Sequence, residues 1–270
     1  MIDCGEAAQV QMRRSHIKFS RLNHIFISHL HGDHCFGLPG LISTLGLLGR
    51  RGELVIHGPH EVESYLTPIL DLFCKGMPYP VRFNAVDPKQ HALVMEDRSL
   101  CVYSIPLKHR IPCCGYLFAE KPKEAHIIRE MTDFYQVPVS QMRAIKAGAD
   151  FVTPDGEVVP NCRLTRPADP PKRYAYCSDT LFRPEIIPFI EGVDLLYHEA
   201  TFLHCEAARA KETFHSTAQQ AAEIARQAHV KRLLIGHYSA RYETLDALKQ
   251  EADAIFPGTI LAQEGLQLSL

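Results

Sequence analysis

The sequence predicts an α/β fold, in which short buried strands alternate with amphipathic helices. Runs rich in β-branched, leucine or aromatic residues are typical of buried strands, and they occur at 24–28, 54–56, 100–105, 174–177, 193–197 and 231–236. Other segments space their apolar residues by three or four positions, as helices do; these are 40–48, 59–73, 216–229 and 244–255.

The composition is that of an ordinary globular protein and excludes several classes. Of the 270 residues, 46% are apolar and 22% are charged. No run approaches the ~18 consecutive apolar residues of a membrane-spanning helix, and the first residues lack the basic and apolar regions of a signal peptide. The formal net charge is −2, so overall charge would not attract the chain to nucleic acid or to anionic lipid.

The nine cysteines predict a reducing compartment. Their number is odd and no two of them are spaced as Cys-x-x-Cys, so neither a disulfide framework nor a zinc–thiolate site is indicated. We therefore expect free thiols, a cytoplasmic location and no membrane partner.

One stretch, residues 120–173, breaks the alternation of strands and helices. It contains a helical pattern at 124–135, a second short helical piece, a tight turn at 153–156 and a proline-rich segment at 167–171. Over 121–173, nine basic and seven acidic residues make it mildly basic in an acidic chain. About fifty such residues are too many for an ordinary connection, which predicts an inserted functional arm. A charged arm without a ligand is the alternative.

The strongest chemical signal is a cluster of potential metal ligands directly after the strand at 24–28. The segment His29-Leu30-His31-Gly32-Asp33-His34 places three imidazoles and one carboxylate within six residues. Such groups suit Zn²⁺, Mn²⁺ or Fe²⁺. A lone histidine is more often structural, but a cluster of this density predicts a metal site.

Three further candidate ligands each follow a predicted strand directly. These are His109, Asp179 and His237. Each of them alone is as easily a hydrogen-bonded histidine or a turn aspartate. Taken together, three strand ends that supply His, Asp and His predict the remaining ligands of the cluster.

With these residues in place, the chain resembles the metallo-β-lactamase superfamily along essentially its whole length, and within it the ribonuclease Z family. Members of this family are endonucleases that trim the 3′ trailer of precursor transfer RNA. The cluster at 29–34 is common to the superfamily, whereas three motifs point to the ribonuclease Z branch: His198-Glu199-Ala200-Thr201, His215-Ser216-Thr217 and His237-Tyr238-Ser239-Ala240-Arg241. Asp3-Cys4-Gly5-Glu6, Lys108-His109, Gly115-Tyr116 and Ser178-Asp179-Thr180 also match.

The resemblance implies an αββα sandwich, with two mixed β-sheets flanked by helices. It would form a single catalytic domain over 1–270, into which the flexible arm at 120–173 is inserted. Relatives also begin with further strands ahead of Asp3, which are missing here. We expect the true reading frame to start upstream of Met1; the alternative is a protein that lacks these strands.

The resemblance further implies a site for two divalent metal ions, with zinc as the first expectation and manganese as the alternative. The ligands carried over from the family are His29, His31 and His109 for one ion, Asp33, His34 and His237 for the other, and Asp179 between them. Asp3 would orient the ligands through hydrogen bonds without contacting the ions, and His198 would be a supporting residue of the same kind. The ions would supply the nucleophile and stabilise charge on the attacking and leaving oxygens, and Asp33 would also orient the attacking water.

Glu199 and His215 resemble a carboxylate–imidazole couple that gives a proton to the leaving 3′ oxygen. Candidates for contact with phosphate groups or RNA are Ser216, Thr217 and Arg241 near the site, and Arg143 and Lys146 on the arm.

The expected function is therefore a metal-dependent endoribonuclease that cuts precursor transfer RNA after the discriminator base and leaves a 3′ hydroxyl. In this family an arm grips the transfer RNA elbow of substrate bound to the other subunit, so a homodimer is expected. The family's glycine–proline signature in the arm appears here as Val137-Pro138-Val139-Ser140. The alternatives are another phosphodiesterase or hydrolase of the superfamily, or a non-catalytic RNA-binding relative.

Overall fold

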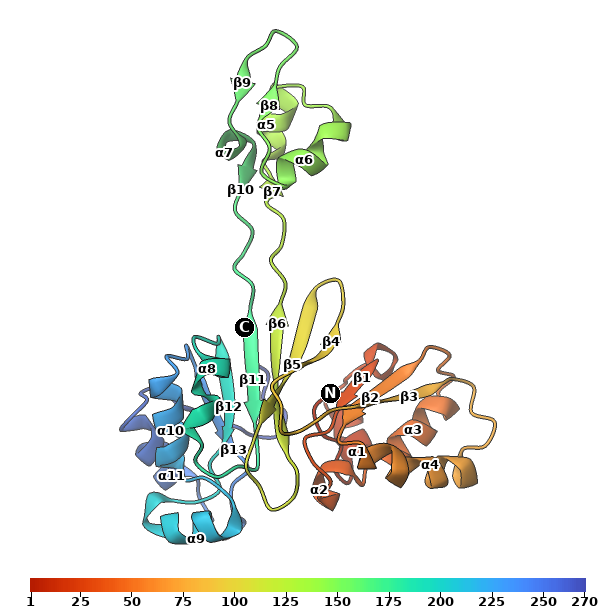
Figure 1. Ribbon diagram of the computed structural model, residues 1–270, viewed down its shortest axis with the longest axis vertical. Helices are drawn as coiled ribbons and strands as arrows, with labels where there is room; N and C mark the ends of the chain where they lie inside the picture. Colours follow the sequence, from red (N-terminus) through yellow and green to blue (C-terminus); the bar gives the residue numbers. More distant parts are fainter. The chain divides into compact units, whose positions relative to one another are not determined.

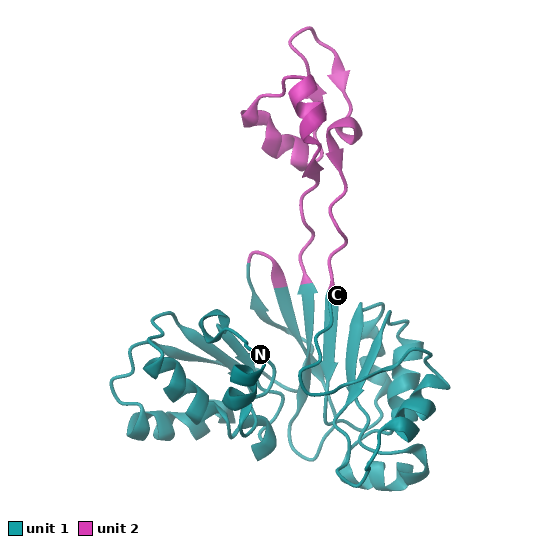
Figure 2. Cartoon of the chain, turned by 180° about the vertical axis from the view of Figure 1, so that it is seen from behind, with its two compact units in different colours: residues 1–97, 101–119, 173–270 teal, residues 98–100, 120–172 magenta.

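The computed structural model describes residues 1–270, which form two compact units (Figure 2). The larger unit comprises residues 1–97, 101–119 and 173–270, and the smaller unit comprises residues 98–100 and 120–172. None of the helices combines the length and the apolar character that crossing a membrane requires.

A seven-stranded sheet is the centre of the larger unit (Figure 1). Its order is β14-β13-β12-β11-β6-β5-β4. The bounds of these strands, in chain order, are β4 (Leu93–Glu96), β5 (Leu100–Pro106), β6 (Cys114–Glu120), β11 (Arg173–Cys177), β12 (Leu195–Glu199), β13 (Leu233–Gly236) and β14 (Ile260–Leu261). Strands β11 to β14 pair in parallel, whereas β6 is antiparallel to β11 and β4 to β5. This sheet is therefore mixed, as expected.

A second sheet contains three strands, β1 (His24–Phe26), β2 (Leu54–Gly58) and β3 (Val81–Ala85). All three pair in parallel, so this sheet differs from the expectation of two mixed sheets. The reason lies in the connections. Helix α3 (Leu38–Leu47) joins β1 to β2 and helix α4 (Glu61–Phe73) joins β2 to β3, and a helical crossover returns the chain in the same direction.

Each sheet is packed against its own helices. Apolar residues of β11, β12 and β13 pack against α8 (Ile187–Ile190), α10 (Ala218–Gln227) and α11 (Asp246–Asp253). The smaller sheet packs against α3 and α4, which lie on its outer side in Figure 1. The remaining helices of this unit are short: α1 (Ala8–Arg14), η1 (Phe19–Arg21), α2 (Gly32–Cys35), η3 (Pro184–Ile186), η4 (His204–Glu206) and α9 (Ala207–Thr213).

The smaller unit has a small core of its own, formed by Val137, Ile145, Phe151, Val159 and Leu164. Its elements are β7 (His126–Ile127), α5 (Arg129–Phe134), η2 (Val139–Gln141), α6 (Met142–Lys146), β8 (Phe151–Val152), β9 (Val158–Val159), α7 (Asn161–Leu164) and β10 (Thr165–Arg166).

Two local predictions for this unit can be compared with the structure. The turn at 153–156 is the tip of the antiparallel hairpin formed by β8 and β9, and Gly156 there has a φ of 86°. The helix predicted at 124–135 is shorter, because residues 126–127 pair instead with strand β10. The helix starts only at Arg129.

Candidate metal centre

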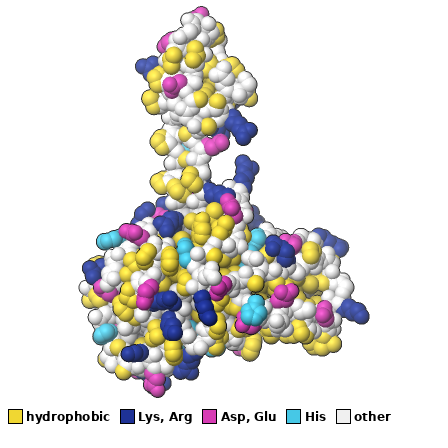
Figure 3. Space-filling view, in the orientation of Figure 1, with side chains coloured by type: hydrophobic (Ala, Val, Ile, Leu, Met, Phe, Trp, Pro, Cys, Tyr) yellow, Lys and Arg dark blue, Asp and Glu magenta, His cyan; other side chains and the backbone are white.

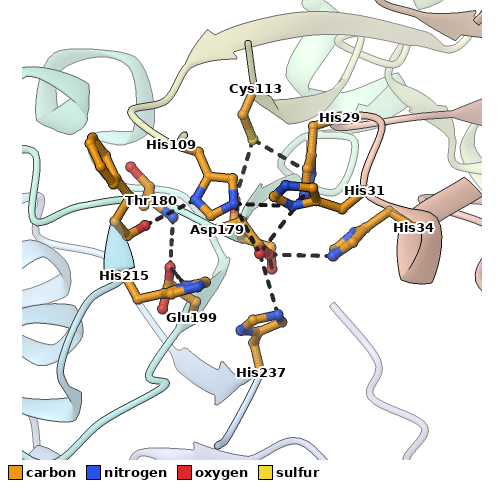
Figure 4. A network of polar contacts seen from close by, with 12 residues as sticks. His29, His31, His34, His109, Cys113, Asp179, Thr180, Glu199, His215 and His237 are labelled. Carbon is orange, nitrogen blue, oxygen red and sulfur yellow. Dashed lines mark hydrogen bonds and ion pairs between the residues drawn. The ribbon is translucent and has the colours of Figure 1, made fainter. Parts of the chain in front are cut away.

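Seven side chains converge where strands end in the larger unit, and Figure 4 labels all of them except Asp33. The segment after β1 brings four of them, the loop between β5 and β6 one, and the ends of β11 and β13 one each. In chain order they are His29, His31, Asp33, His34, His109, Asp179 and His237. The candidate ligands selected from the sequence are these same residues.

The first subgroup consists of three histidines. Nε2 of His29 lies 3.0 Å from Nδ1 of His31, and Nε2 of His109 lies 3.3 Å from the same atom. Three ring nitrogens of buried or half-buried side chains therefore face one another at close range.

The second subgroup consists of Asp33, His34 and His237. Oδ2 of Asp33 lies 3.5 Å from Nε2 of His34. Asp179 lies between the two subgroups: its oxygens are 3.4 Å from His237 and 3.6 Å from His34 on one side, and 3.9 Å from both His29 and His109 on the other.

The outer ring nitrogens of four histidines are held by acceptors, which fixes their tautomers. Nδ1 of His34 donates to Asp3 at 2.8 Å and Nδ1 of His109 donates to the carbonyl oxygen of Phe214 at 3.0 Å. In the same way, His29 donates to Ser28 Oγ and His237 to Thr201 Oγ1, both at 2.9 Å. In each case Nε2 points into the centre, and its lone pair can coordinate a cation when this nitrogen is unprotonated.

Lone pairs that face one another repel unless a cation lies between them, so this donor set fits a metal ion. Burial lowers the pKa of His29 to about 2, which keeps that ring neutral and able to coordinate. Burial raises the pKa of Asp179, but His237 and the other histidines around it outweigh this and lower it to about 2, so the carboxylate is ionised.

Asp3 lies behind this centre and holds it through partners that the sequence did not reveal. Its carboxylate accepts hydrogen bonds from the backbone N–H and the hydroxyl of Ser28, at 2.8 and 2.9 Å, and from the hydroxyl of Tyr176 at 3.2 Å. Burial lowers the pKa of His34, but the hydrogen bond to Asp3 outweighs it and raises the pKa to about 9.

Glu199 and His215 form a hydrogen-bonded pair next to the centre, with Oε1 of Glu199 2.9 Å from Nδ1 of His215. Glu199 is completely buried, and its remaining acceptor capacity is used by the backbone N–H groups of Thr180 and Ser216 and by the hydroxyl of Thr201. Burial lowers the pKa of His215, but the bond to Glu199 outweighs it, so the pKa is raised. The His215 ring is stacked on His237, with centroids 5.2 Å apart.

Thr201 connects this pair to the centre, a role that the sequence alone did not indicate. Its hydroxyl donates to Oε2 of Glu199 at 2.6 Å and accepts from Nδ1 of His237 at 2.9 Å. The motif 198–201 contained the residue, but one of its partners comes from a strand end 36 positions away.

Two of the predicted phosphate contacts do not fit the structure. Ser216 and Thr217 are completely buried. The Ser216 hydroxyl donates to the carbonyl oxygen of Thr180, and the Thr217 hydroxyl caps helix α10 by accepting from the backbone N–H of Gln220. Both hydroxyls are therefore occupied inside the protein and have no access to a phosphate.

Arg241 is exposed and forms an ion pair with Glu206, so part of its charge is already compensated. His198 donates to the carbonyl oxygen of Glu199 at 2.8 Å, and its buried Nε2 has no hydrogen-bond partner. Within residues 1–270, no hydrogen bond joins His198 to a candidate ligand. Arg143 and Lys146, the remaining predicted RNA contacts, lie exposed on α6 of the smaller unit.

Comparison with known proteins places this fold and site in a family. The family model described as the β-lactamase superfamily domain matches residues 1–238, so the chain belongs to that superfamily. Together, this fold and the clustered histidines and aspartates indicate the use of divalent metal.

Relatives identify the branch of the superfamily. The ribonuclease Z of Parabacteroides distasonis is 80% identical over the whole chain, which covers 89% of that protein, and the ribonuclease Z of Bacteroides fragilis is 64% identical with the same coverage. The crystal structure of human tRNase Z, short form, is 25% identical with a TM-score of 0.68, and the match covers 99% of this chain and 86% of that one. The chain belongs to the ribonuclease Z family.

Proposed function

We propose that this chain is a metal-dependent endoribonuclease that removes the 3′ trailer of precursor transfer RNA, cutting after the discriminator base and leaving a 3′ hydroxyl. The observation that carries this proposal is the buried Glu199–His215 pair directly beside the candidate metal centre. Relatives that share this chain's whole length are named ribonuclease Z, and tRNase Z is among the structures that share its fold.

We assign two divalent ions to the centre, with zinc as the first candidate and manganese as the alternative. His29, His31 and His109 would hold one ion, Asp33, His34 and His237 would hold the other, and Asp179 would contact both, because each set lies close together. When bound, such ions activate water and stabilise charge on the attacking and leaving oxygens of a phosphodiester.

Side chains of this protein would supply the proton that the leaving 3′ oxygen takes up. Glu199 holds Nδ1 of His215, so Nε2 of His215 is the atom that faces the substrate. Cleavage breaks the bond between phosphorus and the 3′ oxygen, and His215 gives its proton to that oxygen, which leaves as a hydroxyl while the phosphate stays on the trailer. The hydrogen bond to Glu199 raises the pKa of His215 and so favours the protonated form that this step requires.

We also propose a homodimer in the cytoplasm, in which the smaller unit contacts RNA. Leu47, Leu72 and Phe73, near the ends of α3 and α4, are 86%, 73% and 75% exposed, and large exposed apolar side chains of this kind suit a subunit interface. All nine cysteines are free, which is compatible with a reducing compartment. Arg143 and Lys146 on α6 would contact phosphates of the RNA.

The test is to incubate the purified protein with a precursor transfer RNA, with Zn²⁺ or Mn²⁺ added, and to map both new ends. We expect a single cut that leaves a 3′ hydroxyl on the transfer RNA and a 5′ phosphate on the trailer. A chelator should abolish cleavage and either metal should restore it. An intact precursor after incubation with metal-loaded protein would reject the proposal, and hydrolysis of small phosphodiesters alone would favour another hydrolase of the superfamily.

A further inference from the structure

A hollow of about 440 Å³ opens beside His109 in the larger unit. Its wall is the loop between β5 and β6, together with residues 88–89 from the loop between β3 and β4, and Arg183 from the segment after β11. Its basic side chains come from three separate segments of the chain: Lys89, Lys108, Arg110 and Arg183.

Three of the four basic side chains in this hollow have no acidic partner. No acidic side chain is part of its lining. Lys89, Lys108 and Arg110 are exposed and take part in no ion pair within residues 1–270. Arg183 is paired only with the exposed Glu185, at 3.9 Å. Over the face of the larger unit in Figure 3, by contrast, basic and acidic side chains are interspersed.

The loop that carries two of these cations is held by hydrogen bonds to the residues that directly follow Asp179. The backbone N–H of Lys108 donates to Thr180 Oγ1 at 3.1 Å, and the carbonyl oxygen of Lys108 accepts from the N–H of Leu181 at 2.9 Å. His109 is buried and faces the centre, whereas its neighbours Lys108 and Arg110 are exposed in the hollow. A ligand held here would therefore lie next to the candidate metal centre.

We propose that this basic hollow binds the phosphodiester backbone of the RNA strand on one side of the scissile bond. The inference rests on the proposed function and adds a binding subsite to it. Several phosphates fit this hollow better than one small anion does, because its cations are spread over three segments and three of the four are exposed to solvent. Arginine can contact a phosphate through two N–H groups, and lysine contributes a point charge. The half-buried apolar side chain of Ile111 in the lining suits the ribose and base faces of the same strand.

The test measures RNA binding to the metal-loaded protein as a function of salt. The probes are fluorescein-labelled mature transfer RNA and a labelled single-stranded oligoribonucleotide with the trailer sequence, read by fluorescence anisotropy. The variants are Lys108→Ala, Arg110→Ala and their combination with Lys89→Ala. Arg51→Ala is the matched control, because Arg51 is exposed, lacks an ion pair and lines a different hollow.

For one of the two probes, we expect the triple variant to bind on the order of tenfold more weakly at physiological salt. In a plot of log affinity against log salt concentration, the slope should be smaller in magnitude than that of the wild type. The difference should be roughly 0.7 for each single-strand phosphate that the removed cations had neutralised. Lys108→Arg should restore the salt dependence that Lys108→Ala removes. The probe whose affinity falls identifies the side of the cut that the hollow holds. Metal content and thermal unfolding, measured on each variant, show whether the centre is intact.

Salt dependence equal to that of the wild type for both probes would overturn the inference. This result is separate from failure of the proposed function, which would appear as an uncut precursor with the wild-type protein. Binding of the two probes requires no cleavage, so the hollow remains testable in that case.

Discussion

The hydroxyl of Thr201 lies 2.9 Å from Nδ1 of His237 and donates at 2.6 Å to the carboxylate of Glu199. One small side chain thus connects the buried carboxylate, which holds the proposed proton donor, to a candidate metal ligand. Because the hydroxyl proton is given to Glu199, the oxygen accepts from His237, which presents Nε2 to the centre.

We predict that Thr201→Val weakens metal binding at the subgroup of Asp33, His34 and His237. Valine has nearly the same shape but leaves Nδ1 of His237 without an acceptor, and loss of such a partner typically costs about 10–100-fold in metal affinity. Thr201→Ser keeps the hydroxyl and should bind as the wild type does. Competition with a coloured chelator measures the affinity, and equal affinities for the valine and serine variants would contradict the interpretation.

Replacing the proposed proton donor should slow catalysis without removing the metals. His215→Ala is expected to lower kcat by about 10²–10⁴-fold, the usual contribution of a positioned acid, while metal content measured by mass spectrometry stays at the wild-type level. Glu199→Gln should lower kcat as well, and the double variant should be little worse than either, because the two side chains act as one unit. A wild-type kcat in the His215→Ala variant would show that His215 is not the proton donor.

Asp179→Asn should reduce both metal content and turnover. The substitution removes the charge that lies between the two subgroups, and asparagine tolerates the left-handed backbone at this position, where φ is 56°. Asp169→Asn, an exposed change of the same kind in the smaller unit, is the control and should leave the metal content unaltered. Full metal occupancy in Asp179→Asn would show that the carboxylate is not a ligand.

Folding stability should depend on pH through His57, which is not among the candidate metal ligands. His57 is buried, its ring stacks on Phe26, and burial lowers its pKa from 6.5 to about 4. Between these values the unfolded chain binds a proton that the folded chain does not, so stability falls as the pH falls from 6.5 to 4, by up to about 3 kcal/mol. Urea unfolding at several pH values measures this slope, which should become shallower in His57→Gln. An unchanged slope in that variant would assign the pH dependence to other groups.

The candidate ligands could be located from the sequence because each follows a strand that has a clear apolar pattern. Strands with weaker patterns were not predicted: β3 contains Arg82 and Asn84, and β6 begins with Cys114 and Gly115. Gly115 explains why β6 has a weak strand pattern: a Cβ at this position would lie 2.2 Å from the carbonyl oxygen of Tyr176. The close approach of the neighbouring strand requires glycine here, although glycine has a low strand preference.

The hydrogen bonds that hold the candidate ligands could not be predicted from the sequence for a different reason. Tyr176 donates to Asp3 across 173 positions of sequence, and no local pattern carries such a pairing. For Ser216 and Thr217, in contrast, the sequence suggested a function that the structure does not allow. Their hydroxyls suggested phosphate contacts, whereas packing against Thr180 and the start of helix α10 uses them as structural groups.

The backbone around the centre has a further consequence for how this protein can evolve. Asp3, Asp179, Phe214 and His237 all have φ between 50° and 62°, a region that costs of order 1 kcal/mol or more for residues other than glycine. The packing around these four positions must offset this cost, because such backbone conformations persist only where the surrounding structure holds them. Substitutions that loosen the cores behind the two sheets should therefore disturb the geometry of the centre as well as the stability of the fold.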